Sequence, residues 1–94
     1  MKKWNDLIVP QHRIVNLTSQ PISCYTNSGE IITYPIGIFD DNPDTYYIVD
    51  YTWKGSTRDD HRFLWVSSRG TGRGGVEVCV LKLCIWPEIR VFPT

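Results

Sequence analysis

Residues 45–53, TYYIVDYTW, form the stretch of sequence that decides the fold class. Aromatic and β-branched residues fill most of this stretch, and such residues are typical of β-strands. Successive side chains of a strand point to opposite faces, so alternate residues of the stretch share a face. We expect one of the two faces to belong to the core, and its members are Tyr47, Val49, Tyr51 and Trp53.

Outward from this stretch, further short runs of the same composition are separated by turn residues. They are residues 13–17 (RIVNL), 22–26 (ISCYT), 30–35 (EIITYP), 63–68 (FLWVSS), 76–86 (VEVCVLKLCIW) and 89–92 (IRVF). The turn at Asn27 to Gly29 predicts a hairpin over residues 22–34, because Asn and Gly tolerate positive φ. No segment has sustained helical periodicity. The sequence therefore predicts an all-β fold, a small antiparallel sandwich or barrel with about six to seven short strands.

The length and the charge balance limit the function. With 94 residues, the chain is expected to form one domain over residues 1–94, with residues 1–11 either a flexible arm or an oligomer contact. Ten basic residues balance ten acidic ones, which argues against binding of long nucleic acids. The charges are nevertheless segregated, because residues 30–53 hold five acidic and no basic residues, whereas residues 54–73 hold five basic and two acidic ones. An anionic ligand would prefer the second segment.

The number of cysteines indicates the cellular compartment of the protein. There are three, Cys24, Cys79 and Cys84. Three thiols cannot all pair, and no apolar run after Lys2 and Lys3 is long enough for a signal peptide or a membrane span. We therefore expect a cytoplasmic protein that does not insert into membranes. Cys79 and Cys84 would point to opposite faces of a strand, so we interpret them as small buried residues rather than as a disulfide or zinc ligands.

The glycine-rich stretch at residues 69–75, RGTGRGG, matches the pattern G-x-G-x-x-G. That pattern binds pyrophosphate when it follows a strand and opens a helix, but the valines after Gly75 predict another strand. We therefore reject dinucleotide binding. Two interpretations stay open: a plain surface hairpin, or a flexible loop whose main-chain N–H groups lie next to Arg69 and Arg73 and bind phosphate.

Catalytic and metal-binding patterns are weak. His12 and His61 are far apart, and the sequence has no metal-ligand pair and no serine elbow. Residues 57–62, TRDDHR, are either a cluster of acid, base and arginine side chains or a short helical turn capped by Thr57. The sequence thus favours a protein that is not an enzyme and holds no metal or cofactor.

The residues expected to bind a ligand lie in and beside the basic segment. Arginines can clamp phosphate bidentately, and an aromatic ring can stack on a base. The candidates for phosphate are Arg58, Arg62, Arg69 and Arg73, and those for stacking are Trp53 and Tyr46. Four Trp and five Tyr are many for a small monomer to hide, so we also expect a homo-oligomer.

Residues 15–35, VNLTSQPISCYTNSGEIITYP, resemble a group of small phage-encoded proteins that begin with an Asn-Leu-Thr-Pro-His motif. Further matches are residues 44–50, the pair Arg58 and Asp60, and residues 74–79, and together they cover about two-thirds of the chain. Ser19 and Gln20 replace the Pro-His of the motif, so no role of that histidine carries over. The segment between Pro35 and Asp44 is also shorter than in the group.

The resemblance implies a phage accessory protein acting in the host cytoplasm. Many such proteins counter host immunity without catalysis. The leading hypothesis is a protein that sequesters a small anionic nucleotide signal. The alternatives are an inhibitor that binds a host defence enzyme, like an anti-CRISPR protein, and a small virion component.

Overall fold

The chain folds into β-strands linked by short turns, as the computed structural model describes for residues 6–50 and 60–94. The strands are β1 (Asp6–Val9), β2 (Ile14–Asn16), β3 (Ile22–Tyr25), β4 (Ile31–Tyr34), β5 (Tyr46–Val49), β6 (Phe63–Thr71), β7 (Glu77–Leu83) and β8 (Arg90–Pro93). Two single turns of 3-10 helix, Gln11–Arg13 and Arg73–Gly75, complete the described elements. The predicted all-β class is confirmed.

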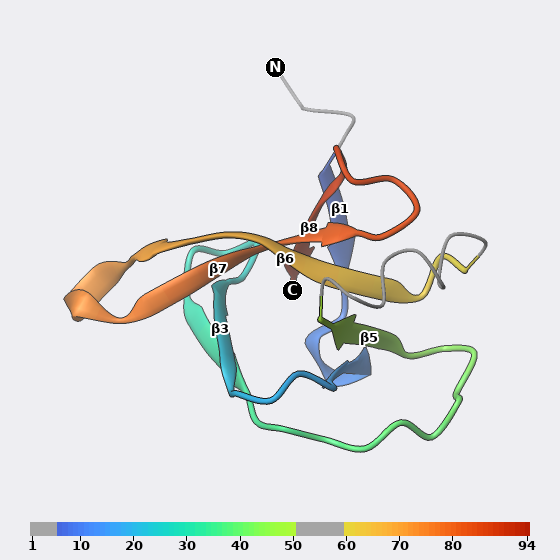
Figure 1. The fold of residues 1–94 in the computed structure, drawn as a ribbon. Coiled ribbons are helices and arrows are strands. Elements are labelled where there is room, and N and C mark those ends of the chain that lie inside the picture. The colour runs from blue at the N-terminus through green and yellow to red at the C-terminus, as the bar shows by residue number, and fades with distance from the viewer. Residues whose placement is uncertain (1–5, 51–59) are drawn as a thin grey trace.

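Two sheets build the molecule. The larger sheet has six strands in the order β1-β8-β7-β6-β5-β2, and it curls so that its two ends run in different directions (Figure 1). The smaller sheet is the β3–β4 hairpin, which packs against β7. The hairpin predicted over residues 22–34 is thus present, and Gly29 takes a positive φ of 86° in its turn.

The large sheet is mixed, whereas the sequence predicts antiparallel strands throughout. β1 pairs with β8, β2 with β5 and β5 with β6 in parallel, while β6–β7 and β7–β8 are antiparallel. Two parallel strands that are neighbours in a sheet need a long connection between them. The connection between β2 and β5 contains the β3–β4 hairpin. Alternation of apolar residues indicates which side chains share a face, but not the direction of the neighbouring strand.

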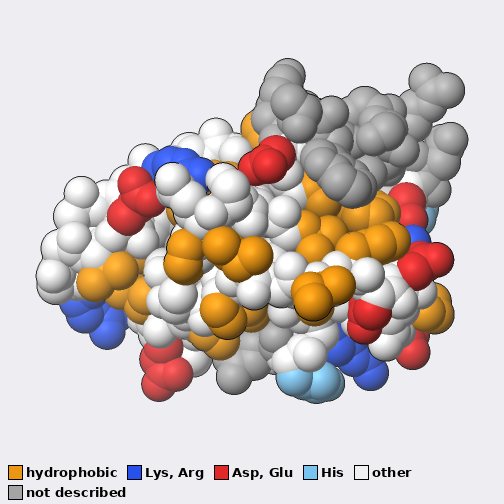
Figure 2. Space-filling model, turned by 60° about the horizontal axis from the view of Figure 1, so that its bottom comes forward, with side chains coloured by type: hydrophobic (Ala, Val, Ile, Leu, Met, Phe, Trp, Pro, Cys, Tyr) orange, Lys and Arg blue, Asp and Glu red, His pale blue; other side chains and the backbone are white. Residues whose placement is uncertain are grey.

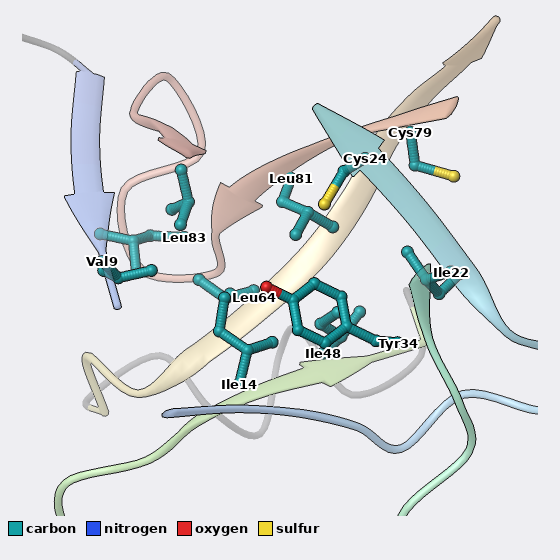
Figure 3. Packing of buried hydrophobic residues seen from close by; sticks show 11 residues of the cluster. Val9, Ile14, Ile22, Cys24, Tyr34, Ile48, Leu64, Cys79, Leu81 and Leu83 are labelled. Atoms are coloured by element: carbon teal, nitrogen blue, oxygen red, sulfur yellow. The ribbon is translucent and has the colours of Figure 1, made fainter. Parts of the chain in front are cut away.

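Strand β5 is buried on both faces, which corrects the prediction of a single core face. Tyr47 and Val49 belong to one apolar cluster with Phe63 and Cys84. Ile48 points the other way, into a larger cluster that fills the space between the two sheets (Figure 3). Central strands with parallel neighbours are commonly covered on both sides, which explains the difference. Tyr51 and Trp53 lie outside the described residues.

The N-terminal segment is partly a strand. The sequence predicts an arm over residues 1–11, but Asp6–Val9 is β1, paired in parallel with β8 from Asp6 opposite Arg90 to Val9 opposite Pro93. Val9 is buried, and the main-chain N–H of Thr94 donates to its carbonyl oxygen at 2.7 Å. The two ends of the described chain therefore stabilise each other.

The glycine-rich stretch is the end of the β6–β7 hairpin. Gly74 and Gly75 have φ values of 72° and 80°, a region that favours glycine. The stretch is followed by β7 and not by a helix, as the sequence predicted. The tip docks on the other hairpin, because the Tyr25 hydroxyl accepts a hydrogen bond from the Arg73 main-chain N–H at 2.9 Å.

Two glycines of this hairpin allow a matched test of that docking. A Cβ on Gly72 would lie 2.8 Å from Val78 Cγ1 and 2.9 Å from the Tyr25 hydroxyl, whereas one on Gly70 meets nothing within 4 Å. We expect Gly72→Ala to lower the free energy of unfolding by about 1–3 kcal/mol through overpacking. Gly70→Ala should change it by less than about 0.5 kcal/mol. Urea unfolding measures both, and equal stabilities of the two variants would contradict the docked arrangement.

Candidate ligand-binding site

The structure separates the arginines that the sequence analysis grouped together. Arg58 and Trp53 lie outside the described residues. Arg62 precedes β6, and Arg69 and Arg73 lie toward the other end of the same hairpin. Since β6 has nine extended residues, its two ends are about 30 Å apart. Arg62 and Arg73 therefore cannot bind one small ligand together.

Arg62 is engaged in holding the fold. Its Nε and Nη2 donate to the Asp60 carboxylate, and its Nη1 donates to Asp41 Oδ1 at 3.0 Å and to the Asn42 carbonyl oxygen at 3.2 Å. The hydrogen bonds from Arg62 hold the pKa of Asp60 below its usual range. The guanidinium carbon also lies 5.8 Å from the centre of the Tyr47 ring. With all three nitrogens in use, Arg62 is better suited to fixing residues 41–42 than to binding phosphate.

Tyr46 lies beside Arg62 but far from Arg69 and Arg73. It lines a small depression of about 230 Å³ together with Arg13, His61 and Asp44. The Tyr46 ring packs partly against the larger core cluster. Because Arg62 is already paired with Asp41 and Asp60, and the charge of Arg13 is offset by that of Asp44, this depression offers little net positive charge to an anion.

Arg73 is directed to the other hairpin. Its Nη2 donates to the Gly29 carbonyl oxygen at 2.7 Å. This contact and the one from its main chain to Tyr25 fix the tip of β6–β7 over the β3–β4 turn. Arg73 does not line the depression beside Tyr46.

A pocket forms where β7 and β8 diverge. These strands pair only at Leu81 opposite Val91 and Lys82 opposite Arg90. Beyond that point β8 continues beside β1, and Pro93 accepts a hydrogen bond from the main-chain N–H of Asn27 at 2.6 Å. Strand β7 instead runs out along the hairpin with β6, so the two strands form a fork (Figure 1). Strand β3 closes one side of it.

This fork pocket, as we call it, has a volume of about 340 Å³ and is lined by residues 24–25, 68–70, 78–81 and 90–92. Most of its lining is apolar, from the valines of β7 and from Leu81 and Val91. Two aromatic rings, Tyr25 and Phe92, are among the lining residues. A mostly apolar cleft of this size with a few polar groups is typical of a small-molecule site.

Two arginines supply the charge of the fork pocket. Arg69, which the sequence analysis selected, is half exposed, and its Nη1 donates to Glu77 Oε1 at 3.2 Å. Arg90 was missed. Its Nε donates to Asp6 Oδ1 at 3.2 Å, and its guanidinium carbon lies 5.5 Å from the centre of the Phe92 ring. The only sequence signal for Arg90 was its place in a run of apolar residues before Phe92.

The cysteines in the fork pocket are unsuited to nucleophilic chemistry. Burial, and to a smaller extent the nearby Cys79, raises the pKa of the Cys24 thiol to about 12. Burial also raises the pKa of Cys79, and Arg69 Nη1 approaches its sulfur at 3.6 Å. The two sulfurs point away from each other (Figure 3). Both thiols are therefore neutral near pH 7, and thiolates are the reactive form. Cys24, Cys79 and Cys84 are all free and buried, and the prediction of buried small residues is confirmed.

Two further properties concern the described part of the chain. In residues 6–50 and 60–94, no group of three or more His, Cys, Asp or Glu side chains lies close enough to hold a metal ion. Over the same residues, no helix is long and apolar enough to cross a membrane.

No protein-family model matches the sequence, and no match was found among curated proteins or among solved structures.

Proposed function

We propose that the chain is a non-enzymatic binding protein that sequesters a small anionic nucleotide in the fork pocket. The observation that carries the proposal is the combination of an apolar cleft with two arginines at its border, Arg69 and Arg90. The apolar interior suits a base, and guanidinium groups bind phosphate through charge-assisted hydrogen bonds. Tyr25 and Phe92 provide rings on which a base can stack.

The size of the pocket limits the ligand. At about 340 Å³ the fork pocket is at the small end of the range for ligand sites, which runs from roughly 300 to 1,000 Å³. We therefore propose a single nucleotide as the ligand rather than a dinucleotide. The two neutral thiols that line the pocket are consistent with binding that leaves the ligand unchanged.

The biological role proposed here follows from the resemblance to phage accessory proteins. A protein that binds a nucleotide signal in the host cytoplasm lowers its free concentration and so withdraws it from a defence enzyme. Such a protein needs affinity and abundance but no catalytic group. We propose this counter-defence role, with a homo-oligomer as the assembled form.

Calorimetric titration with the four ribonucleoside 5′-monophosphates tests the binding function. We expect at least one of them to bind, with an affinity that falls as salt is added, because the phosphate contacts are ionic. The matching nucleosides should bind more weakly. Heat denaturation of the complex should release the nucleotide intact, as judged by mass spectrometry. The absence of binding by all four at millimolar concentration, or release of a cleaved product, would contradict the proposal.

One observation favours inhibition of another protein as a second candidate function. Ile36 and Ile38 are 56% and 85% exposed, and on the face shown in Figure 2 hydrophobic side chains reach the surface between acidic and basic ones. The segment carrying them is held in place, since the Gly37 N–H donates to the Asn16 carbonyl oxygen at 2.7 Å and the Phe39 ring lies edge-on to Tyr47 at 4.7 Å. A fixed apolar projection of this kind suits docking on a protein. Substituting both isoleucines by aspartate should abolish inhibition of a target enzyme if this second function holds, without changing nucleotide binding.

A further inference from the structure

The arginine–carboxylate pairs of the described residues differ in how firmly they are made. Arg62 contacts two carboxylates and uses Nε, Nη1 and Nη2. Arg90 contacts both oxygens of Asp6, at 3.2 Å through Nε and at 3.4 Å through Nη2. Arg69 contacts only one oxygen of Glu77, through Nη1. The pair between Arg69, which lines the fork pocket, and Glu77, which does not, is the least constrained of the three.

The surroundings of Glu77 allow it to release Arg69 readily. The Glu77 side chain is 63% exposed and that of Arg69 is 45% exposed, so neither becomes an unpaired buried charge when the contact opens. Glu77 is the first residue of β7 and lies opposite Thr71, close to the end of the hairpin. Exposed ion pairs with a single contact contribute little stability. Glu77 can therefore turn into solvent at small cost.

We propose that Glu77 is an intramolecular competitor for the ligand, occupying the guanidinium of Arg69 until a phosphate group replaces it. This inference rests on the proposed function of the fork pocket. Only Nη1 of Arg69 carries the described contacts, to Glu77 and to the Cys79 sulfur. A phosphate that binds Arg69 through two nitrogens must take the position of the Glu77 carboxylate or lie beside it and be repelled by it. Asp6 has a different role from Glu77. Both of its carboxylate oxygens contact Arg90, so it orients the plane of the Arg90 guanidinium group.

The proposal predicts a gain of affinity from removing a charge. We expect Glu77→Gln to tighten binding of the ribonucleoside 5′-monophosphate with the highest affinity by about two- to fivefold at low salt, the size of effect expected for a weak exposed ion pair. The gain should shrink at high salt. Asp44→Asn makes the same charge change at an exposed residue that does not line the fork pocket, and should leave affinity within about 1.5-fold of the unchanged chain.

A double-mutant cycle separates competition from a general effect of charge. In an Arg69→Ala background, Glu77→Gln has no guanidinium to release, so we expect it to leave affinity unchanged. Two results would overturn the proposal. One is that Glu77→Gln, with Arg69 present, binds the nucleotide no more tightly than the unchanged chain. The other is that Glu77→Gln gives the same gain of affinity with and without Arg69. If the unchanged chain binds none of the nucleotides, the proposed function fails and the competitor role fails with it. If the chain binds and Glu77→Gln gives no gain, only the competitor role fails.

Discussion

Replacing Tyr47 by alanine is expected to lower the free energy of unfolding by about 3–5 kcal/mol, a large part of the roughly 5–15 kcal/mol typical of a domain. The Tyr47 ring is fully buried and lies 5.7 Å from the ring of Phe63. Its removal would leave a cavity beneath Phe39 and Arg62, which pack against the same ring. Chemical denaturation followed by circular dichroism measures the change.

Tyr47→Phe is the matched control for this substitution. It keeps the ring and removes the hydroxyl, which donates to Asp40 and accepts from the Asn42 N–H at 2.7 Å. We expect a loss of about 1 kcal/mol, the usual contribution of a hydrogen bond. If Tyr47→Ala is no less stable than Tyr47→Phe, the ring does not have the structural role described here.

Arg69→Ala and Arg90→Ala are each expected to weaken nucleotide binding by about 10- to 150-fold, which corresponds to about 1.5–3 kcal/mol for a charge-assisted contact. Both side chains line the fork pocket, and their guanidinium groups provide its positive charge. Calorimetry at fixed ionic strength measures the loss. The melting temperature should be recorded as well, because Arg90 also contacts Asp6 of β1.

Arg73→Ala is the control for these two substitutions. It removes the same charge from the hairpin that carries Arg69, but Arg73 contacts the Gly29 carbonyl oxygen and does not line the fork pocket. We expect nucleotide affinity to remain within about twofold of the unchanged chain. A loss at Arg73 equal to that at Arg69 would place the phosphate at the tip of the hairpin and not in the fork pocket.

The strands were largely predictable because they depend on local composition. Runs of β-branched and aromatic residues between turns located seven of the eight described strands, and the short hairpin at Asn27 to Gly29 followed from its turn residues. Strand β1 was missed because its partner, β8, lies at the opposite end of the chain. Such pairing depends on the tertiary structure and leaves no periodic signal in the neighbouring sequence.

The site was harder to predict, since proximity in sequence is a poor guide to proximity in a sheet. Arg62 and Arg69 are seven positions apart, but an extended strand carries them away from each other. Arg69 and Arg90 are distant in sequence, yet the β7–β8 fork brings both to one pocket. Arg90 could have been selected only with knowledge that β8 pairs with β7.

The central claim is that the fork pocket binds a nucleotide, and two-dimensional ¹H–¹⁵N NMR during titration with the ribonucleoside 5′-monophosphates tests it most directly. The claim predicts that amide signals of residues 24–25, 68–70, 78–81 and 90–92 shift together with one dissociation constant, because these residues line the pocket. Signals of Arg13, Tyr46 and His61, in the depression at the far end of β6, should stay in place. Shifts confined to that depression, or no shifts at all, would contradict the account.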